Sequence, residues 1–148
     1  MRIFNFKEKY YRDIAPRRTR EGIIFEAITI AILLMSLIMA VAVWKNSGRL
    51  INLKALGIGI FASLYLLYEA YHPRDTEYGA RAQTHKQRYY ASRGIRIIAL
   101  ILALIIFFME LNNIDAIGDK ITDIAAIILT GLLFTIWTAM VFLIKKIK

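Results

Sequence analysis

The sequence predicts an all-α integral membrane protein, a four-helix bundle with short loops and an N-terminal amphipathic interfacial helix. Three observations support this fold class. Hydrophobic residues make up 58% of the 148-residue chain, above the ~45–50% typical of soluble domains. They gather in four long blocks, each near the ~20 residues that a helix needs to cross a bilayer core. The blocks are continuous rather than alternating, which excludes a membrane β-barrel.

We expect membrane-spanning helices over residues 23–44, 53–71, 95–111 and 124–144. Charged residues lie mainly near the ends of the first three windows, and the fourth window contains none. A soluble bundle of buried helices would need polar helix faces, which these windows lack. Residues 16–148 are therefore expected to form a single membrane domain.

Residues 1–15 precede this domain and form a separate amphipathic segment. Its apolar side chains recur at spacings of three and four, at Ile3, Phe6, Tyr10 and Ile14. This spacing places them on one face of a helix, with basic residues elsewhere around it, as in helices that lie along a lipid surface. Pro16 then interrupts the helix. We interpret the segment as a lead-in along the membrane surface, with a docking surface for a partner as the alternative.

Basic residues indicate the orientation. Sixteen of the 20 Lys and Arg residues lie in the N-terminal stretch, in the polar segment between the second and third windows with its margin, and in the C-terminal tail. With four spans, these regions share one side, which the positive-inside rule assigns to the cytoplasm. We therefore expect a cytoplasmic-membrane protein with both termini inside. Anionic lipid head groups, rather than nucleic acid, account for the net charge of +9.

Ionisable residues within the windows form the candidate site. Glu26 lies about one turn inside the first window, Glu69 near the end of the second, and Arg96 at the start of the third. All three fall in the cytoplasmic leaflet, so we expect them to cluster, with His72 and Tyr65 as possible neighbours. The cluster could carry protons or bind a cation, or it could tie helices together. Its shallow depth favours the structural interpretation.

Small residues at helical spacing indicate packing faces. On the third window, a stripe that contains Arg96, Ala99, Ala103, Phe107 and Glu110 is expected to contact other helices. We also expect packing seams at Ala27/Ala31 and Ser36/Ala40, at Ala55/Gly59/Ser63, and at Gly131/Thr135/Thr138.

Catalytic motifs are missing from the sequence. It contains no Cys and two His residues, His72 and His85. It has no HExxH pair, no Gly-rich phosphate loop and no GxSxG element. We therefore expect no enzymatic activity, no cofactor and no metal.

The order of several features is similar to a known family. Pro16-Arg17-Arg18-Thr19-Arg20-Glu21 precedes the first window, Tyr71-His72-Pro73 ends the second, and Gln87-Arg88-Tyr89-Tyr90-Ala91-Ser92-Arg93 leads into the third. In this order, residues 16–148 resemble the four-helix membrane domain at the N-terminus of the bacterial sporulation-delaying-protein immunity family. The resemblance implies an immunity or accessory role. The family usually has a longer first outer loop than Trp44–Arg49, and no functional residue is carried over.

The sequence therefore predicts a small multi-pass membrane protein that acts without catalysis, as a binding, accessory or immunity-type protein. Its expected partners are the lipid bilayer and either another membrane protein or a second copy of the chain. A proton-coupled small transporter that works as a dimer is the alternative, and a structural subunit of a larger complex is the third.

Overall fold

The structure, a computed structural model, describes residues 20–47, 53–70, 85–114 and 117–146. These residues form four α-helices: α2 (Arg20–Ser47), α3 (Leu53–Glu69), α4 (His85–Asn113) and α5 (Asp119–Lys146). No strand occurs within these ranges, so the described part of the chain is all-α, as predicted. The predicted interfacial segment 1–15 and His72 lie outside the described residues.

Each helix overlaps one predicted window, but the boundaries differ. α4 begins at His85, ten residues before the apolar window, because residues 85–94 contain no proline and helical hydrogen bonding continues through polar sequence. α2 and α5 also extend beyond their windows at both ends. α3 ends at Glu69, two residues earlier than predicted. Pro73 follows in the sequence, and the residue before a proline disfavours the helical conformation.

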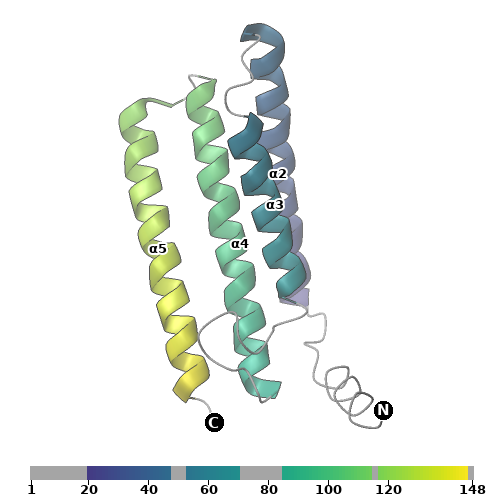
Figure 1. Ribbon diagram of the computed structural model, residues 1–148, viewed down its shortest axis with the longest axis vertical. Coiled ribbons are helices and arrows are strands. Elements are labelled where there is room, and N and C mark those ends of the chain that lie inside the picture. Colours follow the sequence, from purple (N-terminus) through teal and green to yellow (C-terminus); the bar gives the residue numbers. More distant parts are fainter. Residues whose placement is uncertain (1–19, 48–52, 71–84, 115–116, 147–148) are drawn as a thin grey trace.

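The four helices run alternately in opposite directions (Figure 1). The first residues of α2 and α4 therefore lie at the same end of the molecule as the last residues of α3 and α5. α4 packs against the three other helices, α2 and α3 touch each other little, and the backbone of α5 is adjacent to α4 alone. The described helices are thus arranged around α4 rather than in a closed ring.

Small side chains let the neighbours approach α4 closely. Ala91, Ala99 and Ala103 are at most 1% exposed, and a Cβ atom on Gly94 would lie 2.5 Å from Sδ of Met140 on α5. Two apolar clusters result. One joins α3, α4 and α5 through Ala70, Ala91, Ile95, Ile98, Met140 and Ile144. The other joins α2, α3 and α4 through Leu33, Ala40, Leu56, Ala103 and Ile106.

The predicted packing faces have mixed outcomes. The stripe on α4 is buried at Arg96, Ala99, Ala103 and Glu110, as expected, and Ser36, Ala40 and Ser63 are also buried. Two seams are not packed in the described chain, because Ala27, Ala31, Gly131, Thr135 and Thr138 are exposed. Small residues permit close helix approach without requiring it, so spacing alone does not select the seam that is used.

Large apolar side chains cover the outside of the described helices. Ten of them on α2 and eight on α5 are exposed, whereas Met109 is the one exposed on α4. In the described part of the chain, three helical segments are long and apolar enough to cross a membrane: Arg20–Asn46, Tyr90–Asn113 and Asp119–Lys146. Half of the apolar window in α4 is buried, against 22% in α2 and 11% in α5.

Candidate functional site

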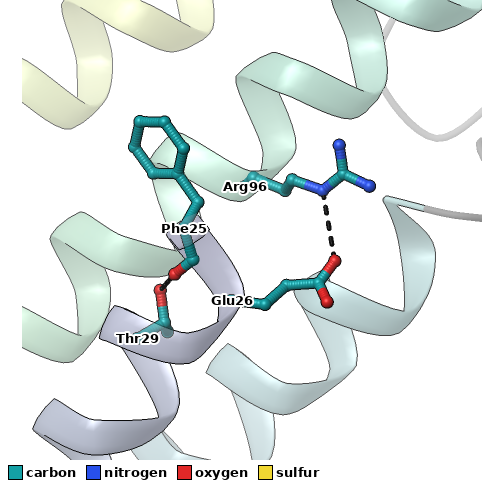
Figure 2. A network of polar contacts seen from close by, with 4 residues as sticks. All are labelled: Phe25, Glu26, Thr29 and Arg96. Atoms are coloured by element: carbon teal, nitrogen blue, oxygen red, sulfur yellow. Dashed lines mark hydrogen bonds and ion pairs between the residues drawn. The ribbon is translucent and has the colours of Figure 1, made fainter. Parts of the chain in front are cut away.

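An ion pair joins α2 to α4 near the end of the molecule where both helices begin. Nε of Arg96 lies 3.4 Å from Oε1 of Glu26, and Figure 2 shows the two side chains meeting between the helices. The side chains of Arg96 and Glu26 are only 7% and 13% exposed, so water screens the two charges poorly. Removing one partner of a buried ion pair is typically strongly destabilising.

Gly22 provides the space for the guanidinium group. A Cβ atom at this position would lie 2.7 Å from Cζ and from one terminal nitrogen of Arg96. Gly22 and Glu26 are four residues apart, so they share one face of α2. The helix therefore presents a gap beside the carboxylate, and the guanidinium occupies it.

The nearby hydroxyl groups of α2 are satisfied within the helix. Oγ1 of Thr29 donates a hydrogen bond to the carbonyl oxygen of Phe25 at 2.7 Å (Figure 2). Oγ of Ser36 donates to the carbonyl oxygen of Ile32 at 2.9 Å. Because each hydroxyl bonds to the carbonyl four residues earlier, Thr29 and Ser36 are buried at little cost in unsatisfied polar groups.

Glu69, the last residue of α3, is fully buried. Neither of its carboxylate oxygens has a hydrogen-bond partner among the described residues. Burial of a polar group without such a partner is costly, and burial of a charge is more so. Glu69 is therefore the acidic side chain of the candidate site that the described residues leave without a hydrogen bond.

The register of α3 and α4 places Glu69 at the level of Arg96. A Cβ atom on Gly59 would lie 2.5 Å from Cδ1 of Ile106, so these two positions are level. The two helices are antiparallel, so ten residues after Gly59 in α3 correspond to ten residues before Ile106 in α4. These positions are Glu69 and Arg96. Membership of Ala70 in one cluster with Ile95 agrees with this register.

A second buried polar group lies one turn before Arg96 on α4. The side chain of Ser92 is 1% exposed, and its Oγ has no hydrogen-bond partner in the described ranges. Ser92 precedes Arg96 by four residues, so the two share a helix face. Unlike Thr29 and Ser36, Ser92 does not bond to the carbonyl of its own helix.

Two other charged contacts lie outside this group. Nη2 of Arg93 is 2.8 Å from Oε1 of Glu21, but both side chains are nearly half exposed, and such pairs contribute about 0–1 kcal/mol. At the opposite end of α4, the buried Glu110 has a hydrogen bond with the side chain of Asn113. Neither contact leaves a buried carboxylate without a partner.

The structure brings part of the predicted cluster together. Glu26 and Arg96 form an ion pair, and Glu69 lies at their level. Tyr65 is 43% exposed and does not join the buried group, because it lies on the outer face of α3. His72 lies outside the described residues. Sequence reasoning missed Ser92 and Gly22, although their spacing of four from Arg96 and Glu26 was a usable signal.

The arrangement brings charged and polar side chains together between apolar helices. Among the described residues, no group of three or more His, Asp or Glu side chains could hold a metal ion. What the site combines is one guanidinium, two carboxylates and a serine hydroxyl in apolar surroundings. This chemistry suits binding a small cation or fixing helices.

Comparison with known proteins adds no relative. No family model matches the chain, and no curated protein or solved structure matches it significantly. The described residues therefore define an all-helical structure with three apolar helices long enough to cross a membrane. The resemblance to the immunity family stays a prediction.

Proposed function

We propose that the protein is a multi-pass protein of the cytoplasmic membrane that acts by binding another membrane component, without catalysis. The observation that carries the proposal is the exposure of apolar side chains along α2 and α5. Monomeric soluble proteins rarely expose contiguous apolar patches larger than a few hundred Å². In a bilayer the same side chains contact lipid, and the exposure costs nothing.

In this proposal all four helices cross the membrane as a bundle. α3 has 17 residues, which corresponds to about 25 Å at ~1.5 Å per residue. This length is slightly below the ~30 Å hydrocarbon core, and a short span is accommodated by local thinning or by snorkelling of flanking residues such as Lys54. The termini and residues 72–94 then lie in the cytoplasm, on the side with most Lys and Arg residues.

Cysteine labelling tests the topology, since the natural chain contains no cysteine. An impermeant thiol reagent applied to intact cells should label Asn46→Cys and Asn113→Cys, and it should spare Gln83→Cys until the cells are opened. The opposite pattern would invert the topology. Labelling of all three positions in a soluble fraction would overturn membrane insertion.

The binding role draws on the position of α5. Among the described helices its backbone is adjacent to α4 alone, so its outer side is available to lipid, to another membrane protein or to a second copy of the chain. The resemblance noted above favours an accessory or immunity role. Purification in mild detergent tests it, because a partner should co-purify with the chain. Substitutions in the outer loops, rather than Glu26→Gln, should abolish this co-purification.

A second candidate is a proton-coupled small transporter that works as a dimer. The buried Glu26–Arg96 pair and the buried Glu69 favour it, because ionisable groups within membrane spans often mark ion or substrate pathways. Its test is Glu26→Gln in reconstituted vesicles. Loss of pH-dependent transport by a variant that circular dichroism shows to be folded would support the transporter, and unchanged function of the folded variant would support the binding role.

A further inference from the structure

α3 and α5 present apolar surfaces of different length. Uncharged residues extend over 55–68 in α3 and over 124–144 in α5. At ~1.5 Å per residue, the two stretches are about 21 Å and about 31 Å long. Residues 71–84, which follow α3, contain no Leu, Ile, Val, Met, Phe or Trp, so the sequence offers no apolar extension. α3 is therefore too short for a ~30 Å hydrocarbon core, whereas α5 matches it.

Two close contacts set the levels of these helices against α4. Gly59 of α3 approaches Ile106, and Gly94 approaches Met140 of α5, each with 2.5 Å between the Cβ position and a side-chain atom. α3 and α5 both run antiparallel to α4 (Figure 1). Residues of α3 and of α5 can therefore be matched to residues of α4 by counting from these contacts.

The ends of the two stretches that lie away from the Glu26–Arg96 pair are level. Lys54 of α3 and Asp123 of α5 both correspond to Leu111 of α4. Both charged side chains are exposed, so each marks a boundary between lipid and water. The amine of Lys54 also complements a lipid phosphate at this boundary. The shortfall of α3 therefore does not arise at this end, which is the outer end in the proposed topology.

The cytoplasmic ends of the two stretches lie at different levels. Glu69 corresponds to Arg96 and therefore to Thr138 of α5, which lies seven residues, or about 10 Å, before Lys145. Beyond that level α5 still exposes apolar side chains, such as Phe142 at 63%. Tilting the molecule would shift both ends of a helix together, so it cannot remove a difference confined to one end. The two helices thus require lipid layers of different thickness.

We propose that phospholipids with short acyl chains occupy the cytoplasmic leaflet along the exposed face of α3, so that the membrane is thinner there than along α5. Local thinning is one way in which a bilayer accommodates a short span. The exposed face consists of Ile58, Phe61, Leu64, Tyr65 and Tyr68. Its last two rings are tyrosines, which suit the head-group level that thinning brings to them. The inference rests on the proposed membrane embedding and adds the lipid partner of one helix face.

Depth labels test the thinning, since the natural chain contains no cysteine. Tyr68→Cys on α3 and Thr138→Cys on α5 carry nitroxides, and both replaced side chains are exposed. Contact with oxygen and with a water-soluble nickel chelate reports the depth of each label in dioleoylphosphatidylcholine vesicles. Thr138 lies one residue nearer the cytoplasmic end, so uniform thickness would make its label the shallower. We expect the Tyr68→Cys label to be shallower instead, by about 9 Å.

Ile58→Cys and Ile127→Cys form the matched control. Both isoleucines are 72% exposed, and both correspond to Phe107 of α4, on the outer side. Their labels should lie at equal depth in lipid. Equal depths for Tyr68→Cys and Thr138→Cys, with both control labels in lipid, would overturn the thinning and leave the proposed function standing. Control labels in water would overturn the proposed function as well.

Brominated lipids test the identity of the occupant. A fluorophore on Tyr65→Cys of α3 and one on Phe134→Cys of α5 lie at the same level. In mixed vesicles, brominated dimyristoleoylphosphatidylcholine should quench the α3 fluorophore more than brominated dioleoylphosphatidylcholine does. The α5 fluorophore should show no such preference. Equal quenching by the two lipids at α3, in a variant that circular dichroism shows to be folded, would overturn the proposal.

Discussion

The guanidinium group of Arg96 fills the space that a side chain on Gly22 would need, with Cζ 2.7 Å from the Cβ position. One glycine on α2 thereby admits an arginine from α4, and the arginine reaches a carboxylate one turn further along α2. The absence of a side chain at Gly22 therefore makes room for the buried ion pair between Glu26 and Arg96.

Gly22→Ala should displace the guanidinium and weaken its pair with Glu26. Because the guanidinium is the far end of a flexible side chain and can shift, we expect a loss in the free energy of unfolding at the low end of the about 1–3 kcal/mol typical of overpacking. Unfolding in detergent measures it, and the loss should shrink in a Glu26→Gln background because the pair is already gone. Gly57→Ala is the control: no atom lies within 4 Å of its Cβ position. An equal loss at both positions would contradict the steric explanation.

Single removal of either charge should cost more than removal of both. Arg96→Met or Glu26→Gln alone leaves a buried charge, for which about 3–5 kcal/mol is typical. The double variant should recover part of that loss, and a double-mutant cycle measures the coupling. The exposed Arg93–Glu21 pair provides the comparison, with an expected coupling of about 0–1 kcal/mol. Similar coupling energies for the two pairs would show that burial of Arg96 is unimportant.

Ala103→Leu should disrupt the packing of α4, because Ala103 is fully buried between helices. We expect about 1–3 kcal/mol of destabilisation from overpacking. The same substitution at Ala139, which is exposed on α5, should change stability little. Thermal unfolding in detergent compares them, and equal tolerance would mean that α4 is not the central helix.

Phe134→Lys should impair membrane insertion, because Phe134 is exposed near the middle of α5. A lysine at the centre of a span costs about 2.5–3.5 kcal/mol on insertion scales. Ile121→Lys, near the start of the same helix, should be tolerated because its amine reaches the interface. The fraction of protein in washed membranes is the measurement. Normal yield of a soluble Phe134→Lys variant would argue against a spanning α5.

The sequence predicted well where the helices lie along the chain. It predicted poorly which faces of these helices pack against other helices. Continuous apolar windows located α2 to α5, since no other backbone structure suits such blocks. Lipid and protein interior are equally apolar, however, so hydrophobic periodicity does not distinguish a packed face from an exposed one. Ala99 and Ala31 therefore look alike in sequence, although Ala99 is buried and Ala31 is exposed.

The candidate site was predictable in outline because charges in apolar windows are conspicuous. Glu26, Glu69 and Arg96 stand out from their neighbours for this reason. The details depended on the register between helices, which comes from contacts such as Gly59 with Ile106. Ser92 was inconspicuous because a serine in a helix usually bonds to its own backbone.

The central place of α4 has a consequence for biogenesis. α2 and α3 touch each other little, and each packs against a helix that follows both in the chain. While the ribosome has delivered only the first two helices, neither has its main neighbour. In the proposed membrane protein, stable tertiary structure therefore begins only when the third described helix is inserted, and a chaperone or insertase that shelters nascent segments would act before that moment.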